Sequence, residues 1–208
     1  ENKYDQNPNL YSRELSIIQG YIERTDKCLA GLKPEQVTME DPAIKNSLMV
    51  LDKIVQRIYF LMQPKSLNRN TFQLPVNESS REAFYFKIKP MLKSIITVSG
   101  NIAQQGLIIG HTAHYFIQLL NDVLDYDPKD ILEMVVQVTR HSVAGRYTTD
   151  SQAVAEMVKI TEKLLADHRG LLLEDGAFQN LLDLLDMYIT TGWPAALELL
   201  WKLDEIFK

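Results

Sequence analysis

The stretch LLDLLDMYITTGWPAALELLWKLDEIF, residues 181–207, holds two helical patterns separated by a glycine and a proline. On both sides of Gly192, apolar residues recur every three or four positions, which is the spacing of an amphipathic helix. Glycine is common just after a helix ends, and proline is tolerated at the first helical position. The stretch therefore predicts helices near 177–191 and 193–207. The connection between them is short, which makes the two helices antiparallel neighbours.

Helical periodicity extends over nearly the whole chain. Asp41-Pro42 and Asp127-Pro128 each place an N-cap residue directly before a proline, as at a helix start. The segment FYFKIK (84–89) alternates like a strand, but the proline and the apolar run that follow it favour a kinked helix. Together the patterns predict the all-α class with about eight antiparallel helices. The others lie at 12–32, 42–62, from 79 through Pro90, at 108–125, 128–144 and 149–168.

Two architectures fit these helices: stacked helix hairpins or an irregular helical bundle. Internal repetition links LLNDVLDY (119–126) with LLDLLDMY (181–188), and LEMVVQV (132–138) with AEMVKIT (155–161). With regular hairpins and prolines at helix starts, the chain resembles HEAT and armadillo repeats in architecture over roughly residues 40–208. Its end also resembles the helical tails of large bacterial NTPases, which implies a helical accessory domain.

Composition is that of an ordinary globular protein. The chain has 208 residues, of which 46 % are hydrophobic and 24 % charged. We expect a linker at 1–10 and a single helical domain at 11–208, as the C-terminal part of a larger protein, because the chain begins at Glu1 with a polar stretch. The single cysteine, Cys28, excludes an intramolecular disulfide and favours a cytoplasmic location. No apolar run approaches the length of about 20 residues that a membrane span needs.

The stretch HTAHYFIQLLNDVLD, residues 111–125, contains histidines and aspartates that are candidate metal ligands. At about 100° per residue, its polar side chains fall within an arc of about 80°, opposite the apolar residues. These polar residues are His111, His114, Gln118, Asp122 and Asp125. The first and the last are about 21 Å apart along the axis, too far to share an ion. We therefore expect a polar helix face and no bound metal.

Motifs that would indicate an enzyme are absent from the sequence. It contains neither H-E-x-x-H nor E-x-x-H, and neither of the glycine-rich phosphate-binding patterns. Cys28 has no histidine near it and fits a small packing residue. The sequence therefore predicts a protein without catalytic activity, metal or cofactor.

One cluster of cations lies where a helix is expected to end. The segment TRHSVAGRY (139–147) contains Arg140, His141, Arg146 and Tyr147. Cations at a helix C-terminus are stabilised by the helix dipole, by about 0.3–1 kcal/mol each. The functional interpretation is a loop that receives an acidic or phosphate-bearing partner, and both interpretations stay open.

The last helical pattern is unusually apolar. On a helical wheel, its apolar residues span an arc of about 220°, whereas one packing interface uses little more than 100°. The helix either lies between two layers of its own domain or docks on another chain or domain. Trp193 and Trp201 are the expected contact residues in the second case, because tryptophan is favoured at interfaces.

The leading functional hypothesis is a non-catalytic, helical interaction or scaffold module. Its partner would be another protein, another domain of the parent chain or a second copy of the chain. The alternative is nucleic-acid binding, because the segment 45–93 carries about six net positive charges while 150–208 carries six net negative ones. The candidate residues for that alternative are Lys45, Lys53, Arg57, Lys87, Lys89 and Lys93.

Overall fold

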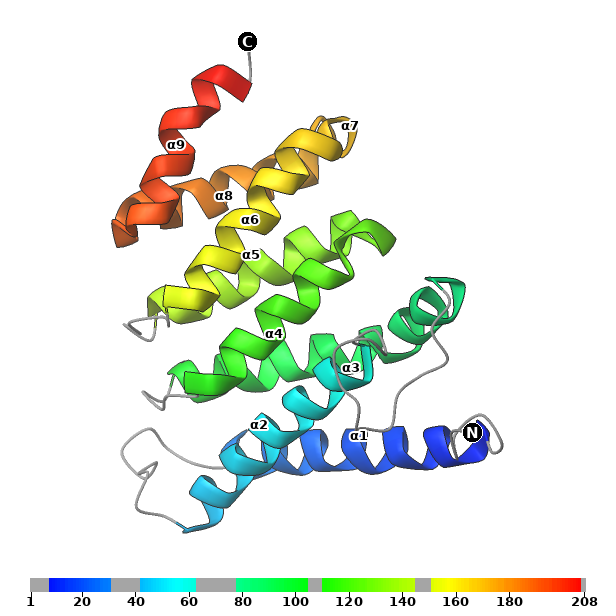
Figure 1. Ribbon diagram of the computed structural model, residues 1–208. Coiled ribbons are helices and arrows are strands. Elements are labelled where there is room, and N and C mark those ends of the chain that lie inside the picture. Colours follow the sequence, from blue (N-terminus) through cyan, green and yellow to red (C-terminus); the bar gives the residue numbers. More distant parts are fainter. Residues whose placement is uncertain (1–7, 31–41, 63–77, 105–109, 145–150, 207–208) are drawn as a thin grey trace. The chain divides into compact units, whose positions relative to one another are not determined.

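The computed structural model describes residues 8–30, 42–62, 78–104, 110–144 and 151–206 (Figure 1). All regular structure within these ranges is helical, which confirms the predicted all-α class. The chain forms two compact units, Glu1–Phe116 and Ile117–Lys208, and their boundary falls inside helix α4 (Gly110–Asp122). The sequence had predicted one domain after a linker at 1–10.

The first unit contains α1 (Pro8–Ala30), α2 (Pro42–Met62), α3 (Glu78–Gln104) and the first turns of α4. Helix α1 packs against both α2 and α3. The buried apolar side chains of these three helices include Ile22, Leu51, Ile58, Leu92 and Ile95. Polar contacts also join these helices. Arg57 of α2 donates to Glu14 of α1 at 2.9 Å, and Nζ of Lys87 on α3 lies 3.4 Å from the hydroxyl oxygen of Ser12 on α1.

Helix α3 continues through Pro90, as predicted. Phe84, Tyr85 and Ile88 are buried within the segment that also fitted a strand. Burial of neighbouring residues and of the residue one turn later is a helical pattern, whereas a strand would bury alternate residues. Packing of this face against α1 therefore outweighs the local strand preference.

Aromatic rings join α2 to the start of α4. The ring of Tyr115 lies 5.3 Å from that of Tyr59 and 5.8 Å from that of Phe60, between centroids. The imidazole of His114 lies beside Tyr115, and its Nδ1 atom is buried with no hydrogen-bond partner among the described residues. These distances are those of favourable tilted ring pairs, so the cluster holds the start of α4 in the first unit.

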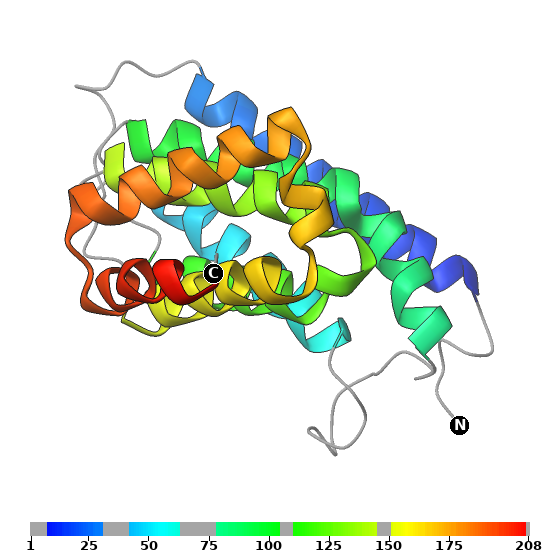
Figure 2. The same cartoon turned by 90° about the horizontal axis from the view of Figure 1, so that it is seen from above.

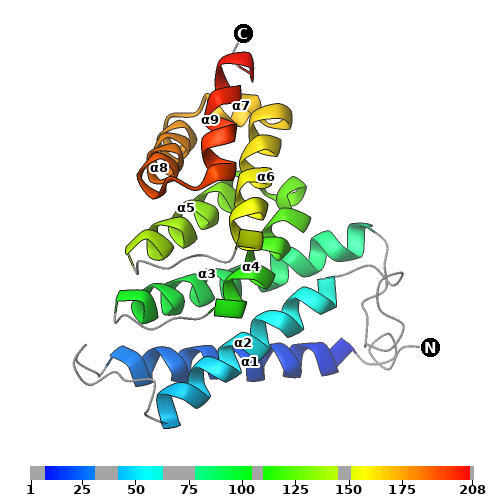
Figure 3. The same ribbon diagram turned by 60° about the vertical axis from the view of Figure 1, so that its left-hand side comes forward.

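The second unit contains the rest of α4 and a series of helices arranged as two hairpins. These elements are η2 (Leu124–Tyr126), α5 (Pro128–Ala144), α6 (Ser151–Asp167), α7 (Arg169–Leu172), α8 (Asp175–Thr191) and α9 (Pro194–Ile206). Helix α5 packs on α8 and α6 packs on α9, so one hairpin lies on the other (Figure 2). The short helix α7 contacts both α6 and α8 and links the hairpins (Figure 3).

Helix boundaries agree with the proline signals and differ elsewhere. Helix α1 begins at Pro8, inside the expected linker 1–10, and not at residue 12. Helices α2, α5 and α9 begin at Pro42, Pro128 and Pro194, where the sequence placed them. The predicted helix 108–125 is wrong at its end, because α4 stops at Asp122 and a separate 3₁₀ turn follows. Backbone bonds from Tyr126 to Val123 and from Asp127 to Leu124 tighten this turn. The polar face of the sequence continued through the break, so periodicity alone did not reveal it.

Gly192 ends α8 in a left-handed conformation, with φ of 64°. Its backbone N–H donates to the carbonyl oxygens of Tyr188 and Ile189, which satisfies groups left open at the helix end. A residue with a side chain is strained in this conformation, whereas glycine is not. Gly192 therefore fixes the turn that brings α9 back along α8.

We predict that Gly192→Ala lowers the free energy of unfolding by about 1 kcal/mol, because alanine is strained at this φ. The control is Gly176→Ala in the same helix, where an added Cβ meets nothing within 4 Å and φ is not positive. That change should raise the free energy by roughly 0.5 kcal/mol. Urea unfolding followed by circular dichroism measures both, and equal effects of the two variants would contradict the role given to Gly192.

Candidate functional site

Exposed apolar side chains gather on the last two helices. On α8 they form a stripe of Phe178, Leu182 and Ile189, with half-buried Leu185 between them. These four residues fall within an arc of about 60° on the helical wheel. The stripe lies beside the buried face of the helix, so α8 is apolar on two adjacent sides.

Helix α9 also carries exposed apolar residues, Leu197 and Trp201. The side chain of Trp201 is 84 % exposed, although Ala196 and Leu199 of the same helix are buried. We call the exposed residues of both helices the α8–α9 apolar surface. It consists of Phe178, Leu182, Ile189, Leu197 and Trp201.

The two predicted tryptophans have different surroundings. Trp193 is half-buried in the turn between α8 and α9, where its ring centroid lies 6.0 Å from that of Tyr188. Trp201 is exposed on the outer side of α9. Trp193 therefore supports the hairpin, while Trp201 is accessible to a partner.

The α8–α9 apolar surface has a rigid base of buried residues. Tyr188 is fully buried, and its hydroxyl lies 3.1 Å from that of Thr161 on α6. Thr161 in turn donates to the carbonyl oxygen of Met157 in its own helix. Burial raises the pKa of Tyr188 far above its ordinary range, and the hydrogen bond with Thr161 opposes this effect. The phenol is therefore neutral and fixes α8 against α6.

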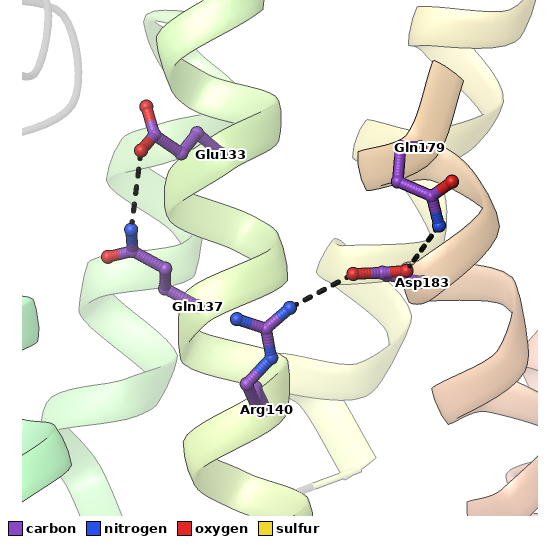
Figure 4. A network of polar contacts seen from close by, with 5 residues as sticks. All are labelled: Glu133, Gln137, Arg140, Gln179 and Asp183. Carbon is purple, nitrogen blue, oxygen red and sulfur yellow. Dashed lines mark hydrogen bonds and ion pairs between the residues drawn. The ribbon is translucent and has the colours of Figure 1, made fainter. Parts of the chain in front are cut away.

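An ion pair sets the rotation of α8 on α5. Arg140 of α5 donates to Asp183 of α8 at 3.0 Å, and Gln179 donates to the other oxygen of this carboxylate (Figure 4). Asp183 lies about 130° on the wheel from the centre of the apolar stripe. The stripe therefore faces away from α5.

The predicted cation cluster is thus only partly a free surface. The guanidinium of Arg140 is used inside the fold, in the contact with Asp183. His141 is half-buried. Burial, which is the larger cause, and the nearby charge of Arg140 both lower the pKa of its imidazole. Its Nδ1 atom has no hydrogen-bond partner among the described residues. Arg146 and Tyr147 lie outside the described residues.

The basic residues proposed for nucleic-acid binding lie on several sides of the first unit. On α3, Lys89 and Lys93 are about 40° apart on the wheel, but Lys87 is about 120° or more from both. Lys87 and Arg57 are directed toward α1. Lys45 and Lys53 are exposed on α2. The three lysines on α3 therefore do not share one face of that helix.

The histidines and aspartates of 111–125 are separated by the end of α4. Asp125 of η2 accepts from Lys163 at 2.7 Å and lies 3.3 Å from Nε2 of His168. The hydrogen bond from Lys163 lowers the pKa of Asp125. Asp122 is exposed, and His114 is half-buried, not exposed as a polar helix face implies. Within the described ranges, no three potential ligands converge as a metal site.

The stripe on α8 was not singled out from the sequence, although its spacing was visible there. Phe178, Leu182 and Ile189 are separated by helical intervals, but so are the buried Leu181, Leu184 and Tyr188. Both sets have the same residue types. Only the position of α5 shows which set is inside.

Comparisons with protein-family models, with curated proteins and with solved structures found no match to this chain. Among the helices of the described segments, none combines the length and apolar character of a bilayer-crossing helix.

We predict that Tyr188→Phe changes the pH dependence of stability. In the unfolded chain the phenol of Tyr188 ionises at about pH 10, whereas in the folded chain it stays neutral to higher pH. The contribution of the Tyr188 phenol to the free energy of unfolding is therefore fully present below about pH 10 and is lost as the pH rises above it. At neutral pH the variant should be less stable by about 1 kcal/mol, because it loses the hydrogen bond with Thr161.

Between about pH 9 and about pH 11, the difference in the free energy of unfolding between the unmodified chain and Tyr188→Phe should shrink by about 1 kcal/mol, because phenylalanine cannot ionise. Urea unfolding at each pH measures it. A difference that stays constant over this range would contradict the buried, neutral state of Tyr188.

Proposed function

We propose that this chain is a non-catalytic, helical interaction module that binds another protein through the α8–α9 apolar surface. The observation that carries the proposal is the exposure of Trp201, which is 84 % on a helix hairpin with four other exposed apolar residues. Contiguous exposed apolar patches mark interaction sites in soluble domains, and exposed apolar residues on two packed helices can form one. Tryptophan is also enriched among the residues that contribute most to binding.

Burial of this surface by a partner would be favourable. Removing apolar surface from water contributes about 25 cal/mol per Å². The side chains stand on two regular helices whose inner faces are packed, so few backbone degrees of freedom are lost on binding. The Arg140–Asp183 ion pair and the Gly192 turn hold these helices in place before a partner arrives.

The packing of the hairpins also supports an interaction role. The α5–α6 hairpin is covered by the α8–α9 hairpin. In stacks of helical repeats, a terminal hairpin needs a polar outer face for solubility. The outer side of α8–α9 is apolar instead, so this hairpin fits an internal layer whose next layer comes from a partner.

We predict that Leu182→Glu or Trp201→Glu weakens partner binding by about 30-fold, since a charge replaces a desolvated contact worth about 2 kcal/mol. Both side chains are exposed, so the melting temperature should stay unchanged. The charge-matched control is Thr190→Glu, because Thr190 is exposed on α8 away from the stripe. This variant should keep full affinity.

A photo-crosslinking residue at position 182 identifies the partner, and the same residue at 190 is the control. Affinity for the purified partner is then measured for each glutamate variant. Equal crosslinking at both positions, or unchanged affinity of both Leu182→Glu and Trp201→Glu, would contradict the assignment of the surface.

A further inference from the structure

We infer that a second copy of this chain covers the α8–α9 apolar surface, so that two copies form a two-fold dimer in which the two α8 helices run antiparallel. The inference rests on the proposed function, because it names the partner for the same surface. It is supported by the spacing of the stripe on α8, by the place of Trp201 on α9 and by the area that the exposed side chains offer.

The exposed apolar residues of both helices point to the outer side of the hairpin. Helix α8 packs on α5 and α9 packs on α6. The stripe on α8 faces away from α5, toward which Asp183 is directed. On α9, the midpoint of Leu197 and Trp201 lies about 150° on the wheel from the midpoint of the buried Ala196 and Leu199. Both sets therefore lie on the side opposite the hairpin beneath them.

The stripe on α8 has a spacing that matches itself in an antiparallel pair. Its residues Phe178, Leu182, Leu185 and Ile189 follow one another at intervals of four, three and four positions, as in the seam of a coiled coil. This spacing is symmetric about the midpoint between Leu182 and Leu185. In a two-fold contact each copy uses the same patch, so Phe178 of one copy meets Ile189 of the other. The middle residues Leu182 and Leu185 meet in the same way.

Trp201 lies level with the midpoint of this stripe. Counted along the chain from the turn at Gly192, both are about nine residues away, one on each of the two antiparallel helices. At a rise of about 1.5 Å per residue, both lie about 13 Å from the turn. A two-fold axis that crosses the middle of the stripe and runs toward α9 therefore also passes near Trp201. The indole of Trp201 then packs against the indole of Trp201 in the other copy.

The size of the surface fits a dimer. At about 200 Å² for a fully exposed side chain of this kind, the exposed residues of the α8–α9 apolar surface offer about 500 Å² in each copy. Since roughly 60 % of an interface is non-polar, a contact between two such surfaces covers about 1,700 Å² in total. Specific, stable interfaces bury about 1,200–2,000 Å², so a second copy is large enough to cover the surface without a further partner.

The acids at the rim predict how the dimer responds to salt. Asp186 and Glu198 are exposed and lie about 70–80° on the wheel from the apolar residues of their helices. Glu198 also interacts with another group of the chain. Both copies bring the same acids, so like charges oppose association at low salt. Salt screens these exposed charges and therefore strengthens the dimer, whereas it would weaken binding to a partner of opposite charge.

Sedimentation velocity of the intact chain, from about 1 µM to about 500 µM, tests the inference. The average mass should rise with concentration and level at twice the chain mass of 23.9 kDa. An increase in salt from about 0.05 M to about 0.5 M should tighten the dimer by about three-fold, because the rim acids are screened.

Glutamate variants test which surface forms the dimer. Leu182→Glu and Trp201→Glu should each weaken it by more than about 100-fold, because the two-fold axis brings every substitution into the contact twice. Thr190→Glu carries the same charge on α8 away from the stripe and should dimerise within about two-fold of the unmodified chain. All three positions are exposed, so circular dichroism should show unchanged helix content and melting temperature.

Crosslinking tests the antiparallel register. In a Cys28→Ser background, Phe178→Cys and Ile189→Cys proteins are treated with a short bis-maleimide, each alone and as a one-to-one mixture, at a concentration where both are dimeric. The mixture should crosslink, because position 178 of one copy meets position 189 of the other. Each variant alone should not, because like positions are about 16 Å apart along the helix axis.

Three results would overturn the inference. The first is an unmodified chain that stays monomeric over the whole range or associates beyond a dimer. The second is association that is as strong in Leu182→Glu or in Trp201→Glu as in the unmodified chain. The third is crosslinking of Phe178→Cys alone in place of the mixture, which would indicate a parallel pair. Crosslinking from position 182 to a different protein, together with a monomeric chain, would leave the proposed function standing while this inference fails.

Discussion

The fold of the second unit depends on how α8 divides its apolar residues. One side, with Leu181, Leu184 and Tyr188, is buried against the neighbouring helices, and the adjacent side stays exposed. The Arg140–Asp183 ion pair and the Tyr188–Thr161 hydrogen bond fix this rotation. If α8 turned to bury the exposed stripe, both polar contacts would break and the buried hydroxyl would lose its partner. The exposed stripe is thus a consequence of the packing and not an accident of the surface.

The sequence was sufficient for the class and for most helix boundaries. Prolines at 42, 128 and 194 and the glycine at 192 mark helix ends through backbone geometry alone, which is local. The end of α4 was missed because a 3₁₀ turn continues the apolar and polar faces of the preceding helix. The segment 84–89 was ambiguous in pattern, and packing against α1 decided it. Local signals therefore succeed where the cause is local and fail where a distant helix decides.

The candidate site shows the same division. The wide apolar arc of the last helix predicted a surface that one interface could not cover, and Trp201 was among its residues. The different exposure of Trp193 and Trp201 could not be predicted, since it depends on the position of Tyr188 across the turn. Arg140 was noted for its charge, but its partner Asp183 is 43 positions away in the chain and was not foreseeable. A charged residue that appears available in sequence is in this case part of the scaffold.

The central claim is that Trp201 lies on a surface that another protein covers. Since the chain has only two tryptophans, Trp193→Phe leaves Trp201 as the single one, and acrylamide quenching then reports its exposure directly. In dilute protein, Trp201 should be quenched like a free indole. On adding an excess of the protein crosslinked from position 182, quenching of Trp201 should fall and its emission should shift to shorter wavelength, because the partner removes the indole from water. Unchanged quenching of Trp201 in the presence of that protein would contradict the claim.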